Sequence, residues 1–207
     1  MTVATLYYVH DPMCSWCWGF RKTFSAMVEQ LTAEIKIVKL LGGLAADSNE
    51  PMPEPMQQYL QATWQKIQHQ IPGVNFNYDF WTDCLPRRST YPACRAVLAA
   101  REQAASFEDP MILRIQQAYY LEAQNPSDVD TLVALAADVG LDQAAFEQDM
   151  MSSKINNKLY EEIARCQAMN ATSFPSLVLE TQQGFNHLAV NYNNAAPMVG
   201  KINQLID

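Results

Sequence analysis

The sequence predicts an α/β protein in which a strand–helix–strand unit and a strand–strand–helix unit flank a large all-helical insertion. Residues 3–9 and 34–41 are short apolar runs typical of buried strands, and a helical pattern lies between them. Residues 45–170 carry a succession of helical patterns. Strand character returns at residues 173–190, before a last helical pattern that ends at Ile206. Together these observations favour a small mixed sheet with helices on both faces.

The first unit predicts two parallel strands joined by a helix over residues 17–31. Phe20, Phe24, Met27 and Leu31 recur at three- and four-residue spacing, which places them on one helix face. A right-handed crossover is expected between the two strands. The residues that follow the first strand then lie at the sheet edge where open α/β sheets carry their chemistry.

The insertion is predicted to begin as a loop over residues 45–55, because Pro51, Pro53 and Pro55 interrupt regular structure. Helices are expected afterwards at residues 56–70, 91–103, 111–122, 127–140, 142–150 and 153–169. Ser89 or Thr90 is expected to cap the second of these helices. The aromatic-rich stretch 74–88 between the first two has no clear period and is predicted to be a packed connection.

The final unit predicts a hairpin of residues 173–180 and 185–190, followed by a helix that Asn193 or Asn194 caps. The domain division is therefore 1–44 with 171–207 for the sheet domain, and 45–170 for the helical insertion. The insertion is expected to pack against the sheet and its active edge.

Cys14 and Cys17 form a Cys-x-x-Cys pair where the first strand pattern gives way to the helix. The first N–H groups of a helix lack partners within it, and with the helix dipole they favour an anion. A thiolate is such an anion, and it is the nucleophile of disulfide exchange. Cys14 is therefore the predicted nucleophile. Cys17 is the predicted resolving thiol, which attacks the mixed disulfide.

A zinc site is the main alternative use of such a pair, and it requires two further ligands at suitable spacing. The other candidate ligands are scattered singly along the chain: Cys84, Cys94, Cys166, His10, His69 and His187. No second close pair exists, so no metal is predicted. The three single cysteines are expected to be buried apolar side chains, while a second redox pair of Cys84 with Cys94 stays open.

Composition bounds the remaining partners and the compartment. The 207-residue chain is 49% hydrophobic and has a formal net charge of -8. An acidic surface disfavours a sequence-independent grip on nucleic acid or on an anionic membrane. No apolar run approaches a membrane span, and the N-terminus shows no export signal, so a cytoplasmic location is expected. In that compartment Cys-x-x-Cys beside a strand–helix–strand pattern indicates a redox motif.

Four motifs resemble the DsbA family of thioredoxin-like proteins, and among these most closely the cytoplasmic FrnE-like proteins, predicted disulfide isomerases. The motifs are Asp-Pro-Met-Cys-Ser-Trp-Cys-Trp-Gly-Phe at 11–20, Tyr-Pro-Ala-Cys-Arg-Ala at 91–96, Val-Gly-Leu-Asp at 139–142 and Phe-Pro-Ser at 174–176. The resemblance spans the length of the chain. It implies a thioredoxin-like fold and a thiol–disulfide oxidoreductase that acts on protein or peptide thiols and disulfides.

The resemblance also implies roles for residues near the cysteine pair. Pro175 is expected to be cis and to face the cysteines, and the backbone of Phe174 is expected to pair with an extended substrate. Ser15 and Trp16 are expected to tune the redox potential, and Trp16 to contact a partner. No cofactor is expected, because the dithiol carries the electrons, and glutathione is a candidate thiol partner.

Two rival functions belong to other classes. The kappa-class glutathione transferases and the 2-hydroxychromene-2-carboxylate isomerases resemble this chain too, but they typically carry Ser where Cys14 stands. A non-catalytic binding module, stabilised by zinc, is the other rival. His10 is a candidate proton-transfer group because it lies close to Cys14 in sequence, and geometry must decide that role.

Overall fold

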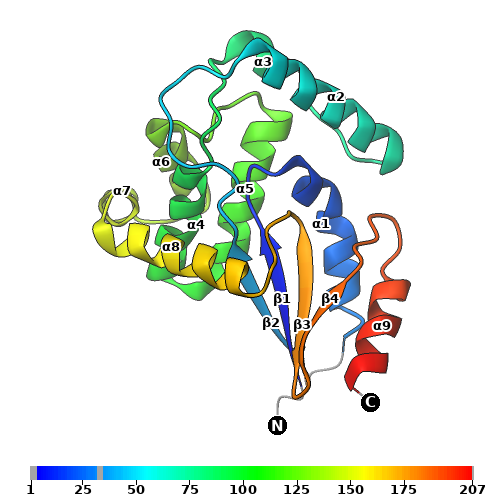
Figure 1. Cartoon of the computed structure of the whole chain (residues 1–207). Coiled ribbons are helices and arrows are strands. Elements are labelled where there is room, and N and C mark those ends of the chain that lie inside the picture. Colours follow the sequence, from blue (N-terminus) through cyan, green and yellow to red (C-terminus); the bar gives the residue numbers. More distant parts are fainter. Residues whose placement is uncertain (1–3, 32–34, 207) are drawn as a thin grey trace.

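The computed structural model describes residues 4–31 and 35–206, and it confirms the predicted fold class (Figure 1). The first unit comprises β1 (Ala4–His10), α1 (Ser15–Val28) and β2 (Ile35–Leu41). The last unit comprises β3 (Ser176–Thr181), β4 (Gly184–Leu188) and α9 (Ala196–Ile206). Between them lies the helical insertion. The predicted strand residue Val3 and residue Glu34 lie outside the described residues.

The four strands form one mixed sheet in the order β2-β1-β3-β4. β1 runs parallel to β2, as predicted, with Tyr8 opposite Lys39. β3 lies antiparallel to β1, and the predicted hairpin of β3 with β4 is also antiparallel. The central position of β1 brings its carboxyl end, with the loop that follows, between segments that are far apart in the sequence.

Alternate residues of β1 face different helices, as the two-residue period of a strand requires. Leu6 and Tyr8 pack with Phe20, Phe24 and Met27 of α1, and α9 completes this layer. Tyr7 and Val9 point the other way, into a cluster with Cys166 at the end of α8 (Ser153–Ala168). The sheet is therefore covered on both faces, and α8 crosses the insertion side of it (Figure 1).

The insertion comprises seven helices within the described residues and a short 3-10 turn at Ala105–Phe107. The other helices are α2 (Glu54–Gln70), α3 (Phe80–Asp83), α4 (Tyr91–Gln103), α5 (Glu108–Leu121), α6 (Val129–Asp138) and α7 (Gln143–Met150). One sequence expectation was wrong here. Pro55 does not block the helix but sits in the first turn of α2, where its missing N–H costs nothing. The stretch 74–88 packs on the core, as predicted, and it contains α3, which is too short to show a helical period.

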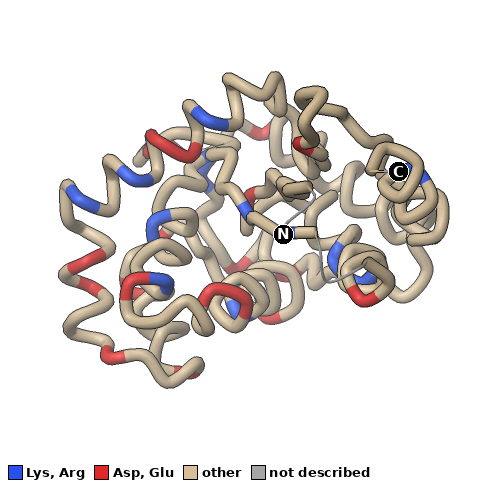
Figure 2. Tube along the Cα trace, turned by 90° about the horizontal axis from the view of Figure 1, so that it is seen from below, with Lys and Arg blue, Asp and Glu red and all other residues tan. Residues whose placement is uncertain are grey.

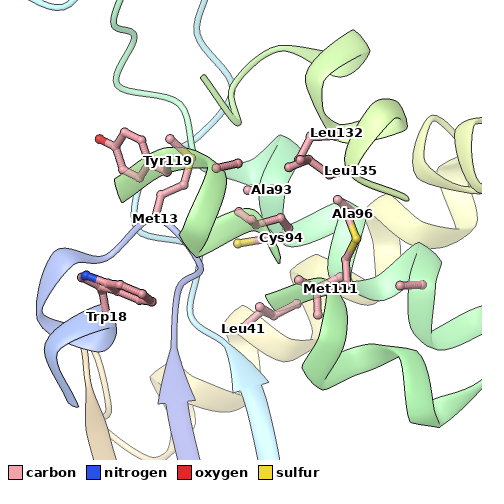
Figure 3. Packing of buried hydrophobic residues seen from close by; sticks show 14 of the residues in the cluster. Met13, Trp18, Leu41, Ala93, Cys94, Ala96, Met111, Tyr119, Leu132 and Leu135 are labelled. Atoms are coloured by element: carbon pink, nitrogen blue, oxygen red, sulfur yellow. The ribbon is translucent and has the colours of Figure 1, made fainter. Parts of the chain in front are cut away.

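One apolar core joins the insertion to the start of α1. Met13 and Trp18 from the first unit pack with Cys94 of α4 and with Met111 and Tyr119 of α5 (Figure 3). Trp18 stacks on Tyr120 with ring centroids 5.6 Å apart. The insertion therefore packs directly beneath the loop that carries the cysteine pair.

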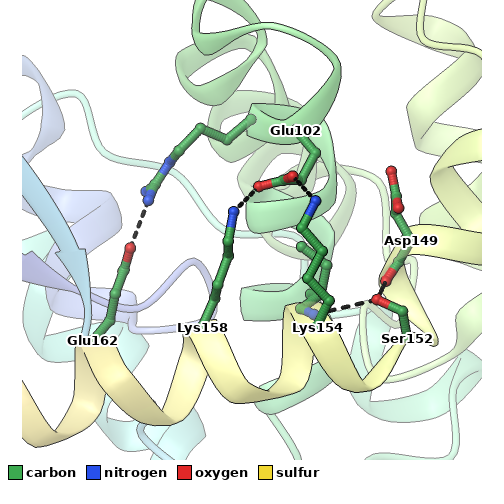
Figure 4. Close-up of polar contacts among 8 residues, drawn as sticks. Glu102, Asp149, Ser152, Lys154, Lys158 and Glu162 are labelled. Atoms are coloured by element: carbon green, nitrogen blue, oxygen red, sulfur yellow. Dashed lines mark hydrogen bonds and ion pairs between the residues drawn. The ribbon is translucent and has the colours of Figure 1, made fainter.

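Charged side chains fasten α8 to α4 and to the sheet (Figure 4). Glu162 pairs with Arg101 at 2.5 Å, and its other oxygen accepts the Leu41 N–H of β2 at 2.7 Å. Glu102 pairs with both Lys154 and Lys158. The hydrogen bond to Leu41 satisfies a backbone donor on an edge strand, which would otherwise offer a site for non-native pairing.

Basic and acidic residues are interspersed along the insertion (Figure 2). Several are paired across elements, such as Arg114 with Glu122 and Asp138. None of the described helices combines the length and the apolar character that a bilayer crossing requires.

Candidate active site

The cysteine pair lies where β1 ends and α1 begins. Cys14 is the N-cap residue of α1, in extended backbone geometry, and its carbonyl accepts the Trp18 N–H at 3.1 Å. The helix therefore begins two residues earlier than the apolar spacing indicated, at Ser15. Within the described residues, no side chain caps this helix start. The first N–H groups of α1 are thus available to stabilise negative charge at Cys14.

The two thiols occupy different environments. Both cysteines are buried, but Cys14 keeps 6% of its surface exposed and donates its thiol to the carbonyl oxygen of Phe174 at 3.4 Å, whereas Cys17 has no exposed surface. Burial raises the pKa of the Cys17 thiol well above its ordinary value, and hydrogen bonding to Cys14 raises it further. Cys17 is therefore held as a neutral thiol behind Cys14.

Residues 173–176 approach the pair from the other half of the sheet domain. The Phe174–Pro175 peptide bond is cis, the geometry that the resemblance implies. The Phe174 ring lies against Gly42, where an added Cβ would come within 1.9 Å of it. A glycine at position 42 is therefore needed for Phe174 to reach its place beside Cys14.

Asp11 is a buried carboxylate that organises the loop before Cys14, and sequence reasoning gave it only a turn-shaping role. It accepts hydrogen bonds from the Met13 N–H and the Leu44 N–H, both at 2.8 Å. Thr90 donates its hydroxyl to Asp11 at 2.6 Å, and Cys94 donates its thiol at 3.4 Å. Burial raises the pKa of Asp11, while these donors favour its ionised form. This one carboxylate thus joins the ends of both parallel strands to the start of α4.

The Asp11 contacts explain two other observations. Thr90 precedes α4, as predicted, but its side chain bonds to Asp11 and does not cap the helix. Cys94 bonds to Asp11, whereas Cys84 donates to the Ala123 carbonyl at 3.0 Å. The motif at 91–96 is a weak sequence signal, yet its Cys94 contacts Asp11 in the loop before Cys14.

Ser15 and Trp16, between the cysteines, differ in exposure. Ser15 is buried, and Trp16 is half-buried between Tyr192, at a ring-centroid distance of 5.0 Å, and Lys66 at 5.8 Å. Trp16 therefore bridges the start of α1, α2 and the segment before α9.

His10 is also buried, at the end of β1, where it stacks on Tyr8. Burial and the nearby Lys39 and Arg101 charges lower the pKa of His10 to about 3, so its ring is neutral at physiological pH. In the described part of the chain, no three His, Cys, Asp or Glu side chains form a group that could hold a metal ion.

The chain is similar to known proteins in sequence and in fold. The curated relatives include the ClpXP adapter protein SpxH of Halalkalibacterium halodurans, 23% identical over 177 residues, which are 84% of this chain. This chain spans only 57% of the length of that protein.

Among the solved structures that share the fold over nearly the whole chain are two that are 23% identical to it. One is a protein of Nitrosomonas europaea assigned provisionally as a protein disulfide isomerase, with a TM-score of 0.83 and 23% identity, covering 98% of this chain and 96% of that one. The other is the cytosolic disulfide reductase DsbM of Pseudomonas aeruginosa, with a TM-score of 0.72 and 23% identity, covering 98% and 95%. The thioredoxin family profile matches residues 7–198, and the chain therefore belongs to the thioredoxin family.

Proposed function

We propose that this protein is a thiol–disulfide oxidoreductase that works in the reducing direction, as a disulfide reductase or isomerase. The observation that carries the proposal is the asymmetry of the pair. Cys14 lies at a helix start beside the Phe174 carbonyl, and Cys17 is a buried neutral thiol behind it. A nucleophile and a protected resolving thiol require this arrangement.

The reaction consists of two exchanges. The Cys14 thiolate attacks one sulfur of a substrate disulfide, forming a mixed disulfide and releasing the other sulfur as a thiolate, which takes a proton. Cys17 then loses its proton and attacks the Cys14 sulfur, releasing the second substrate thiol. Two electrons pass from the dithiol to the substrate, and a Cys14–Cys17 disulfide remains. In isomerisation, a substrate thiol resolves the mixed disulfide instead, and no net electron transfer occurs.

Glutathione is the proposed reductant that restores the dithiol. One glutathione thiolate attacks the Cys14–Cys17 disulfide, and a second releases the first as glutathione disulfide. This choice is supported by a solved structure of DsbM with glutathione, a protein with the same fold. A reducing, cytoplasmic setting belongs to the proposal for the same reason, because glutathione keeps thiols reduced there.

The test measures glutathione-dependent reduction of insulin, with glutathione disulfide formation coupled to glutathione reductase. Wild type is expected to raise the rate, and Cys14→Ser to return it to the rate without enzyme. Cys17→Ser is expected to accumulate a mixed disulfide at Cys14, visible as added mass on the intact protein. Cys84→Ser is the matched control, because the Cys84 thiol donates to the Ala123 carbonyl and contacts neither cysteine of the pair in the described residues, and its rate should equal that of wild type.

Two outcomes would contradict the proposal. Full activity in Cys14→Ser would show that Cys14 is not the nucleophile. Undiminished turnover in Cys17→Ser, without a trapped adduct, would favour a glutathione transferase or isomerase that uses Cys14 alone.

A separate measurement gives the direction of the reaction: the ratio of dithiol to disulfide at the Cys14–Cys17 pair, at equilibrium with a glutathione buffer.

A further inference from the structure

A cavity of about 560 Å³ lies behind the cysteine pair, between α1, the β1–β2 half of the sheet and α5 of the insertion. Of the two active-site cysteines, Cys17 lines it and Cys14 does not. Its volume is in the range of small-molecule sites, which often form where two structural units meet. The cavity is therefore separate from the face on which Cys14 meets Phe174.

The walls of the cavity are mostly apolar. Phe24 and Val28 of α1 face Ile112 and Leu113 of α5, and Ile37 of β2 closes the side. These side chains would contact the hydrocarbon body of a ligand. The rim carries exposed polar residues such as Ser25 and Glu29.

Two polar atoms at the floor have no hydrogen-bond partner within the described residues. They are Nε2 of His10 and Oε1 of Gln116, in residues that are only 1% and 2% exposed. Buried polar groups are nearly always paired in folded proteins, with protein, water or a ligand. Both residues line the cavity, but the two atoms themselves are covered by protein, so an occupant could pair with them only if the side chains turned.

Two cationic and three acidic side chains line the cavity, the exposed Glu29 among the acids, and of the two cations Arg21 is the one without an ion pair among the described residues. Arg21 lines it with its guanidinium 5.1 Å from the Trp18 ring centre, and its buried Nε has no acceptor in the part of the chain that the structure describes. Over the same residues, no carboxylate forms an ion pair with Arg21. By contrast, Lys39 pairs with Asp109, and Glu108 is neutralised by Arg101. An acid group is the natural partner of such a guanidinium.

We propose that this cavity binds a small organic anion with an apolar body. The acid group would pair with Arg21, and the body would pack between Phe24 and Ile112. The occupant would contact Cys17 from behind without covering Cys14. This proposal stands on the cavity itself and does not depend on the proposed function.

The test uses 1-anilinonaphthalene-8-sulfonate, an aromatic sulfonate whose fluorescence rises in apolar surroundings. Wild type is expected to bind one molecule saturably. Arg21→Gln should weaken binding by about tenfold or more, since one charge-assisted contact is lost. Lys22→Gln is the matched control, because it removes the same charge from an exposed neighbour on α1, and its affinity should equal that of wild type. Arg21→Lys should recover part of the loss.

Two further measurements locate the site. Ile112→Trp fills the cavity and should abolish saturable binding, with circular dichroism verifying that the variant is folded. N-phenyl-1-naphthylamine, which lacks the sulfonate, should bind with an affinity that Arg21→Gln does not change. Equal dye affinity in Arg21→Gln and Lys22→Gln would overturn the proposal, as would binding that Ile112→Trp leaves intact in a folded protein.

Discussion

Protonation of His10 is expected to couple the stability of this protein to pH. The ring is buried at the end of β1, and its pKa falls to about 3 because of burial and the charges of Lys39 and Arg101. An unfolded histidine titrates near pH 6.5. Between these two values the unfolded chain takes up a proton that the folded chain refuses. The free energy of unfolding therefore decreases as the pH falls below about 6.5.

The magnitude follows from the unfolded-state equilibrium alone, because folded His10 stays neutral throughout this range. Protonation of the unfolded histidine shifts the folding equilibrium toward the unfolded state. Lowering the pH from about 7.5 to about 5.5 strengthens this shift about tenfold, which lowers the unfolding free energy by about 1.4 kcal/mol. Asp11 acts in the opposite direction, because its raised pKa favours the folded state as the pH falls. Its contribution is common to wild type and to a His10 variant, so it cancels in the comparison.

The assay is urea unfolding of wild type and His10→Gln at both pH values. Between the higher and the lower pH, the unfolding free energy of wild type should fall by about 1.4 kcal/mol more than that of His10→Gln. This difference does not depend on how much the substitution itself destabilises the protein at the higher pH. His69→Gln, which removes an exposed imidazole from α2, is the matched control and should behave as wild type. Equal pH dependence in wild type and His10→Gln would refute the reasoning, because it would mean that the buried ring accepts a proton at no cost.

Two further predictions concern packing around the site. Gly42→Ala should lower the unfolding free energy by about 1–3 kcal/mol and slow disulfide exchange, because its Cβ would displace the Phe174 ring, whereas Gly200→Ala, with open space around it, should not destabilise. Urea unfolding and the insulin assay measure both. Glu162→Gln should cost about 1–3 kcal/mol by weakening its ion pair with Arg101, whereas the exposed Glu161→Gln should cost little; equal losses would contradict this account.

The fold class and the cysteine pair could be predicted because their signals are local. The strand and helix periods on either side of Cys14 place it at a helix start from ten or so neighbouring residues. The hairpin of β3 and β4 has a comparable local signature, as does the cap of α7, where Asp142 accepts the Ala145 N–H. In each case the residues that determine the structure are also adjacent in the chain.

The Asp11 cluster could not be predicted, because its members are distant in the sequence. Thr90 and Cys94 reach Asp11 across 79 and 83 residues, and the local pattern around neither residue indicates this contact. Thr90 has the character of a helix cap, and Cys94 that of a small apolar side chain. A buried carboxylate selects hydrogen-bond donors from any part of the fold, so tertiary placement overrides such local preferences.

These long-range contacts make the insertion part of the active site, although the sequence separates it from the cysteine pair. Asp11 lies in the loop before Cys14 and accepts hydrogen bonds from Thr90, the residue before α4, and from Cys94 of α4. Glu162 of α8 accepts the N–H of Leu41 at the end of β2. The next residue, Gly42, lies against the Phe174 ring. Displacing the insertion would therefore disturb both sides of the Cys14 thiol at once. Variation in the insertion can accordingly alter the reactivity of the pair without any change in the Cys-x-x-Cys sequence itself.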